Sequence, residues 1–179
     1  MDYPQPQQHS QVVSPFVVGL YETFMHPQGT DNDGCQYLSV VQWYPETLQS
    51  YIDDRIASGE GFEMTMPIIR SLIECVEWIH SRKICHLNLK PSNFVRDPYM
   101  ASSVDRARGT GWKLVDFEAA RVIDEEPVGR CTISYAAPEI LVGLTSSIGV
   151  HTKGALDIWS LGLVIFELLT DQPLFRTDD

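Results

Sequence analysis

The stretch His86-Leu87-Asn88-Leu89-Lys90-Pro91-Ser92-Asn93 places four chemically active side chains within eight residues. It lies in a polar loop, from Cys85 to Val95, that is flanked by apolar residues. Taken alone, His86 is more often a satisfied core histidine than a catalytic group. Asn93, taken alone, can stabilise a loop by bonding backbone groups. The meaning of this stretch therefore depends on the segments around it.

The segments upstream of the loop predict a hairpin followed by two helices. Residues 16–24 and 37–43 are dense in β-branched and aromatic residues, and a polar turn region separates them. The period then changes to that of a short helix, with apolar positions Leu48, Tyr51, Ile52 and Ile56 on one face. A longer helix is expected from about Met66, with Thr65 as its cap and Pro67 in its first turn. Its expected apolar stripe consists of Ile69, Leu72, Ile73, Val76 and Ile79.

Downstream of the loop, a short strand is expected at Trp112 to Asp116 and an irregular stretch from there to about Pro138. The last helix is expected to run from about Leu156 to Thr170. Its predicted buried face consists of Ile158, Leu161, Ile165 and Leu168, widened by Val164 and Leu169. The pattern predicts a mostly helical body with a few strands.

Composition excludes several classes of protein. The 179 residues are 44% hydrophobic, which is ordinary for a folded domain. Thirteen basic against twenty-four acidic residues leave a net charge of −11, which excludes a phosphate-neutralising surface for nucleic acid. The most apolar stretch is interrupted by Asp157 and Glu167, so no membrane span is expected. The four cysteines lack a CxxC pair, and we expect thiols in a soluble protein of the cytoplasm.

Four segments in a fixed order resemble the protein kinase family. The stretch from His86 to Asn93 resembles the catalytic loop, with the pattern His-Arg-Asp-Leu-Lys-Pro-x-Asn. Val115-Asp116-Phe117-Glu118 resembles the Asp-Phe-Gly element. Thr132-Ile133-Ser134-Tyr135-Ala136-Ala137-Pro138-Glu139 resembles the end of a Ser/Thr-kinase activation segment, and Asp157-Ile158-Trp159-Ser160-Leu161-Gly162 the start of the central helix of the lower lobe.

The resemblance implies roles for individual residues around an ATP molecule and Mg²⁺. Asn93 and Asp116 match the residues that hold the metal ion. Lys90 matches the lysine that is directed at the γ-phosphate, and Thr132 matches the threonine that braces this lysine and the catalytic base. Read without the resemblance, Asp116 could cap a turn at a strand end, and Asp157 could be an ordinary carboxylate at a helix N-terminus.

The resemblance also implies an adenine site near the hairpin. Val41 would line the back of the adenine pocket. Gln42, Trp43 and Tyr44 would form the hinge that hydrogen-bonds the adenine edge.

Three positions depart from the family pattern. The catalytic aspartate is replaced by Asn88, and a carboxamide cannot accept the proton of a substrate hydroxyl, a contribution typically worth 10²–10⁴-fold. The preceding arginine is Leu87, which removes the usual cationic partner of a phosphorylated activation loop. Glu118 replaces the glycine after Phe117, which restricts the backbone and adds charge near the metal site; it could also help to hold a cation.

The fold expected from the resemblance is α+β and protein-kinase-like, with a mostly helical C-lobe. Residues 1–15 are expected to be a flexible lead-in, 16–44 the last N-lobe strands and the hinge, and 45–179 the C-lobe. The rest of the N-lobe and the last C-lobe helices have no counterpart in the sequence.

The expected function is phosphoryl transfer from ATP to a protein Ser or Thr, impaired in this chain by Asn88 and by the missing N-lobe. The main alternative is a pseudokinase that binds nucleotide or a protein partner. A small-molecule phosphotransferase and a non-kinase helical scaffold are the remaining possibilities. The expected partner is a protein substrate or binding protein.

Overall fold

The computed structural model describes residues 14–26, 36–59, 65–97, 111–124, 131–146 and 149–176. The helices of this part are α1 (Leu48–Ser58), α2 (Thr65–His80), α4 (Pro138–Ser146) and α5 (Gly154–Thr170), with single 3₁₀ turns at Pro91–Asn93 and Ile133–Tyr135. Its strands are β1 (Leu20–His26), β2 (Gln36–Val41), β3 (Glu46–Thr47), β4 (Ile84–Cys85), β5 (Phe94–Arg96), β6 (Trp112–Leu114) and β7 (Arg121–Val122). The predicted α+β fold class and its mostly helical body are confirmed.

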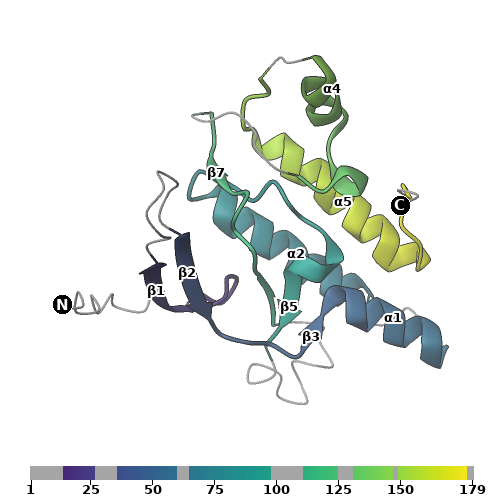
Figure 1. The fold of residues 1–179 in the computed structure, drawn as a ribbon. Helices are drawn as coiled ribbons and strands as arrows, with labels where there is room; N and C mark the ends of the chain where they lie inside the picture. The colour runs from purple at the N-terminus through teal and green to yellow at the C-terminus, as the bar shows by residue number, and fades with distance from the viewer. Residues whose placement is uncertain are drawn as a thin grey trace.

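Helices α2 and α5 run side by side through the centre of the molecule, and α1 lies across one end (Figure 1). On α2, Leu72, Val76 and Ile79 are buried as expected. Ile73 is 46% exposed, so its place in the predicted stripe is wrong, and Ile68 and Cys75 are buried instead. The buried face is rotated because α2 contacts both α5 and β6, and the sequence period does not fix which side meets two partners.

The predicted face of α5 needs a similar correction. Leu161, Val164 and Leu168 are buried, and Ile165 is half-buried. Ile158 and Leu169 are 56% and 47% exposed, although both were expected to be covered. The almost continuously apolar sequence of this helix does not by itself identify the face that packs on α2.

The predicted hairpin is confirmed as the antiparallel pair β1–β2. The first strand starts at Leu20 rather than Phe16, because residues 16–18 leave the hairpin and join β6. Val18 N donates to Leu114 O (3.1 Å), and Leu114 N donates to Phe16 O (2.8 Å). Ser14, whose side chain accepts from the N–H groups of Phe16 and Val17, fixes this segment.

Two small sheets position the loop that follows α2. Strands β3, β5 and β6 form one antiparallel sheet, and β4 pairs with β7 in another. These sheets place residues 86–93 between β4 and β5 and beside the end of β6. The sequence predicted a polar loop here and no strand at either end, because strands of two or three residues carry almost no periodicity.

Helix α4 was not predicted from the sequence. Its nine residues contain Gly143 and Thr145, which weaken the helical signal. It follows directly after the 3₁₀ turn at Ile133–Tyr135, and Ile140 anchors it in a second core cluster. Pro138 occupies its first position, where a missing N–H costs nothing.

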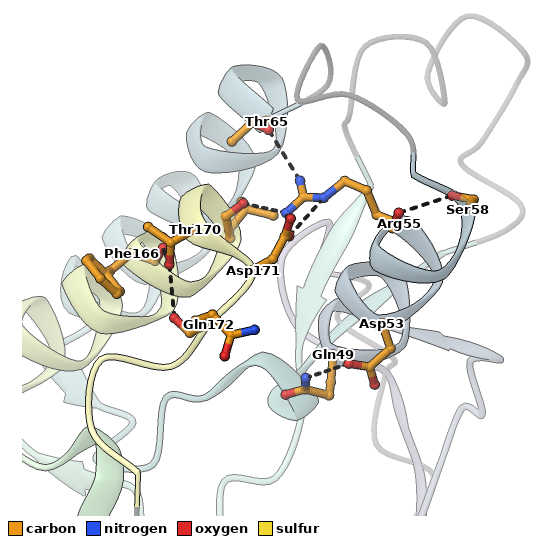
Figure 2. A network of polar contacts seen from close by, with 10 residues as sticks. Gln49, Asp53, Arg55, Ser58, Thr65, Phe166, Thr170, Asp171 and Gln172 are labelled. Atoms are coloured by element: carbon orange, nitrogen blue, oxygen red, sulfur yellow. Dashed lines mark hydrogen bonds and ion pairs between the residues drawn. The ribbon is translucent and has the colours of Figure 1, made fainter.

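Arg55, a buried cation, joins the ends of three helices (Figure 2). This residue of α1 is only 2% exposed. Its Nη2 donates to Leu168 O (2.6 Å) and contacts the Asp171 carboxylate, while Nε donates to Asp171 Oδ1 (3.2 Å). Its Nη1 donates to Thr65 Oγ1 (3.4 Å). Thr65, which was expected to cap α2, is the first residue of this helix. Its hydroxyl accepts a hydrogen bond from Arg55.

Cys75, Cys85 and Cys131 carry free thiols, and Cys35 lies outside the described residues. Within the described ranges, no helix is long and apolar enough to cross a membrane.

Candidate active site

Asp157 on the first turn of α5 holds the start of the predicted catalytic loop. Its side chain is completely buried. Oδ2 accepts from the backbone N–H of His86 (2.8 Å), and Oδ1 accepts from that of Leu87 (2.8 Å). His80 Nε2 lies 2.8 Å from Oδ2. One carboxylate therefore fixes the loop to the central helix, a role that goes beyond the helix-end carboxylate the sequence left open.

His86 is a neutral, buried bridge between the loop and the end of β6. Its Nε2 lies 2.9 Å from Val115 O, and because a carbonyl only accepts, Nε2 carries the proton. Nδ1 then accepts from Asn88 N (3.3 Å). Burial lowers the pKa of His86 below its ordinary 6.5, and this effect exceeds the opposite ones of the Val115 carbonyl and Asp157. The ring packs on Phe117 with a 4.8 Å centroid distance.

Asn88, Asp116 and Asn93 form a hydrogen-bonded ring to which Thr132 is attached, and these four residues together are called the ring below. Thr132 Oγ1 donates to Asn88 Oδ1 (2.6 Å), and Asn88 Nδ2 donates to Asp116 Oδ2 (3.1 Å). Asn93 Nδ2 donates to Asp116 Oδ2 (3.3 Å) and to the backbone carbonyl of Asn88 (2.8 Å). Four residues that are up to 44 positions apart in sequence therefore form one polar cluster.

Backbone conformation directs Asp116 toward this cluster. Its φ is +64°, in the left-handed region that Asp tolerates better than most residues. The side chain is exposed at the end of β6. A carboxylate that is exposed and already aligned by two amides is available to a further ligand.

Leu87 has a positive φ of 63° and a buried side chain. It packs in the apolar cluster that includes Cys85, Ala136 and Leu156. Where the family pattern has a cation, this chain therefore has a hydrophobic contact between the loop and the activation segment. A phosphate on the activation segment would meet no cation at this position.

Lys90 is half-buried, its backbone carbonyl accepts from Asn93 N (2.9 Å), and its ammonium makes no hydrogen bond or ion pair with the described residues. Its neighbours Leu89 and Pro91 are buried, which fixes the backbone that carries it. Beside the ring, a small open hollow of about 120 Å³ is lined by Asn88, Glu118, Ala119, Cys131 and Thr132. Burial raises the pKa of the Cys131 thiol, which favours the neutral, less reactive form.

The activation segment is fixed to α5 by two further contacts that the sequence did not identify. Tyr135 Oη donates to Glu167 Oε2 (2.6 Å), and Ser160 Oγ donates to Tyr135 O (2.7 Å). Burial, with a smaller effect of the hydrogen bond to Glu167, raises the pKa of Tyr135. The 32 residues that separate Tyr135 from Glu167 carry no sequence signal that would reveal this bond.

The residues expected to hold adenine lie at the end of β2 and directly after it. Val41 is 47% and Trp43 79% exposed. Gln42 N donates to Gly19 O (3.1 Å), and Tyr44 Oη donates to Gln42 Oε1 (2.9 Å). Tyr44 is buried. The backbone of Gln42 is therefore bonded to Gly19 and its side chain to Tyr44, while the exposed Val41 and Trp43 side chains remain open to a ligand.

This arrangement of loop, carboxylate and central helix defines a protein kinase lower lobe. Residues 6–179 match the protein kinase domain family, and the chain belongs to it. It is 35% identical over 172 residues to "Glycogen synthase kinase 1" of Pyricularia oryzae. The aligned part makes up 90% of this chain and 38% of the relative.

Two further relatives are similar. "Glycogen synthase kinase-3 homolog YGK3" of Saccharomyces cerevisiae is 32% identical over 169 residues, with 88% of this chain and 40% of the relative covered. "Protein kinase gsk3" of Schizosaccharomyces pombe is 30% identical over 168 residues, with 90% of this chain and 39% of the relative covered. The chain spans about two fifths of the length of these curated relatives.

Proposed function

We propose that this chain supplies the lower lobe of a Ser/Thr protein kinase that transfers phosphate from ATP to a protein hydroxyl at a reduced rate. The observation that carries the proposal is the ring of Asn88, Asn93, Asp116 and Thr132, because it brings the family's metal, base and bracing positions within hydrogen-bond distance. We further propose the domain division given above, with residues 45–179 as the C-lobe.

The ring fits Mg²⁺, which prefers carboxylate and amide oxygens. Asn93 donates from Nδ2 to Asp116 and to the backbone carbonyl of Asn88. Its Oδ1 accepts no hydrogen bond from the described residues. Asn93 and Asp116 would hold the ion. When bound, Mg²⁺ neutralises phosphate charge and ATP supplies the phosphoryl group. Val41, Gln42, Trp43 and Tyr44 would hold the adenine ring.

The chain's own residues determine the rate. The Lys90 ammonium forms no hydrogen bond or ion pair in the described part of the chain, so it can neutralise the γ-phosphate without breaking such a contact. Asn88 can orient the acceptor hydroxyl through Oδ1, but it cannot take up the hydroxyl proton. We therefore expect transfer to be about 10²–10⁴-fold slower than with a carboxylate at this position.

The partner we propose is a protein that presents a Ser or Thr, since Lys90 and Thr132 resemble the Ser/Thr-kinase pattern. A cytoplasmic location is supported by the free thiols of Cys75, Cys85 and Cys131, which suit a reducing compartment.

The test is a transfer assay with radiolabelled ATP and paired Ser, Thr and Tyr peptides, using the full-length protein. We expect slow transfer to Ser and Thr, an increase of about 100-fold or more in Asn88→Asp, and no transfer in Asp116→Asn. Asp54→Asn, an exposed acid on α1, is the matched control. Transfer that stays undetectable in both the wild-type protein and Asn88→Asp would overturn the proposal in favour of a binding scaffold.

A further inference from the structure

We propose that the Asn88 carboxamide acts as a built-in substitute for a cation: it positions the metal-binding carboxylate of Asp116 and keeps the site ordered without Mg²⁺. Asn88 is a positioning residue in this proposal. The inference rests on the proposed function only for the identity of the metal.

One hydrogen bond in the ring, from position 88 to Asp116, requires an amide donor at position 88. Thr132 donates to Asn88 Oδ1 at 2.6 Å, which assigns the carbonyl oxygen to that side. Asn88 Nδ2 is thereby directed at Asp116 Oδ2, 3.1 Å away, and donates to it. Within the ring, Asp116 Oδ2 accepts a second amide hydrogen bond from Asn93.

A carboxylate at position 88 would turn the attraction between position 88 and Asp116 into a repulsion. It could still accept from Thr132, but its second oxygen would lie at about the same 3.1 Å from Asp116 Oδ2. Two like charges at this distance repel strongly unless a cation or a proton lies between them. A carboxylate pair thus needs a cation or a shared proton between its oxygens, whereas the Asn88 amide and the Asp116 carboxylate bond to each other directly.

The same contact weakens the attraction of the nucleotide-free site for a free metal ion. The amide hydrogens of Asn88 and Asn93 point at Asp116 Oδ2, so this oxygen already interacts with positive partial charge. Two negative groups that face each other hold a divalent cation better than one that is hydrogen-bonded. In this chain, Mg²⁺ is therefore expected to enter together with the nucleotide phosphates rather than alone.

The experiment is thermal unfolding of the full-length protein, in chelator and with about 10 mM Mg²⁺, without nucleotide. We expect Mg²⁺ to move the wild-type Tm by no more than about 1 °C. Asn88→Asp should lose about 5 °C in chelator and regain most of it with Mg²⁺. Gln172→Glu, which adds the same charge at an exposed position, controls for net charge and should behave as the wild type.

The exchange variant Asn88→Asp/Asp116→Asn tests the pair directly, because it restores one amide and one carboxylate with the residues reversed. We expect its Tm in chelator to return to within about 2 °C of the wild type. The proposal is overturned if Asn88→Asp has the wild-type Tm in chelator, if Mg²⁺ stabilises both proteins equally, or if the exchange variant is no more stable than Asn88→Asp. Because the readout is Tm, failure here leaves the transfer result intact.

Discussion

Replacement of Asp157 by Asn is expected to destabilise the protein by several kcal/mol, although the side chains have nearly the same shape. The carboxylate is fully buried and accepts from two backbone N–H groups at 2.8 Å each, with His80 Nε2 as a third neighbour. Asn offers one acceptor oxygen, and its NH₂ group would face an N–H donor. One backbone donor is thus left unsatisfied and a charged hydrogen bond is lost.

The magnitude follows from these contacts. A buried donor without a partner costs about 1–3 kcal/mol, and disruption of a buried charged group typically costs 3–5 kcal/mol in total. We expect a loss of about 3–5 kcal/mol in the free energy of unfolding, or about 6–20 °C in Tm for a chain of this size. His80→Phe removes only the third neighbour and should cost about 1 kcal/mol.

Urea and thermal unfolding of the full-length protein provide the assay. Asp54→Asn makes the same chemical change at an exposed position and should stay within about 0.5 kcal/mol of the wild type. If Asp157→Asn unfolds within about 1 kcal/mol of this control, the carboxylate does not hold the loop and the reasoning is refuted.

Three further outcomes are expected. Arg55→Met, which removes the buried cation between three helix ends, should cost about 2–4 kcal/mol in urea unfolding, whereas Met at the exposed Arg70 should cost little. Burial lowers the pKa of His86, so as the pH falls the imidazole is protonated more readily in the unfolded chain than in the folded one. The free energy of unfolding should therefore fall as the pH drops below 6.5. A pH series of Tm checks this, and His86→Gln should flatten the curve while a Gln at the exposed His151 should not. Thr132→Val, which removes the donor to Asn88 Oδ1, should lower the transfer rate about tenfold, and an unchanged rate would contradict the bracing role.

The parts of the site that could be predicted from sequence are those in which order along the chain carries the signal. Asn88, Asn93, Asp116 and Thr132 belong to three segments in a fixed order, and the structure brings all four together. The hydrogen-bond directions could not be predicted, because Asn and Asp differ only in the group they present. Whether Asn88 accepts or donates depends on Thr132, which is 44 residues away.

The fold was predictable where a helix is long enough to show a repeated apolar face. Helix α1 spans the predicted apolar positions, α2 starts one residue before the expected Met66, and α5 starts two residues before and ends at its predicted limits, because each has a repeated apolar face. Ile73 and Ile158 were assigned to the wrong side, since apolar residues surround much of α2 and α5 and tertiary contacts select the buried face. The short strands β3, β4 and β7 are formed by pairing with distant residues, so local sequence says little about them.

The central claim is that Asp116 belongs to a site that binds ATP with Mg²⁺, and nucleotide binding to the full-length protein tests it most directly. Isothermal titration of ATP should show binding that requires Mg²⁺, is lost in Asp116→Asn and is retained in Asp54→Asn. Absence of nucleotide binding by the wild-type protein, or equal binding by Asp116→Asn, would contradict the account.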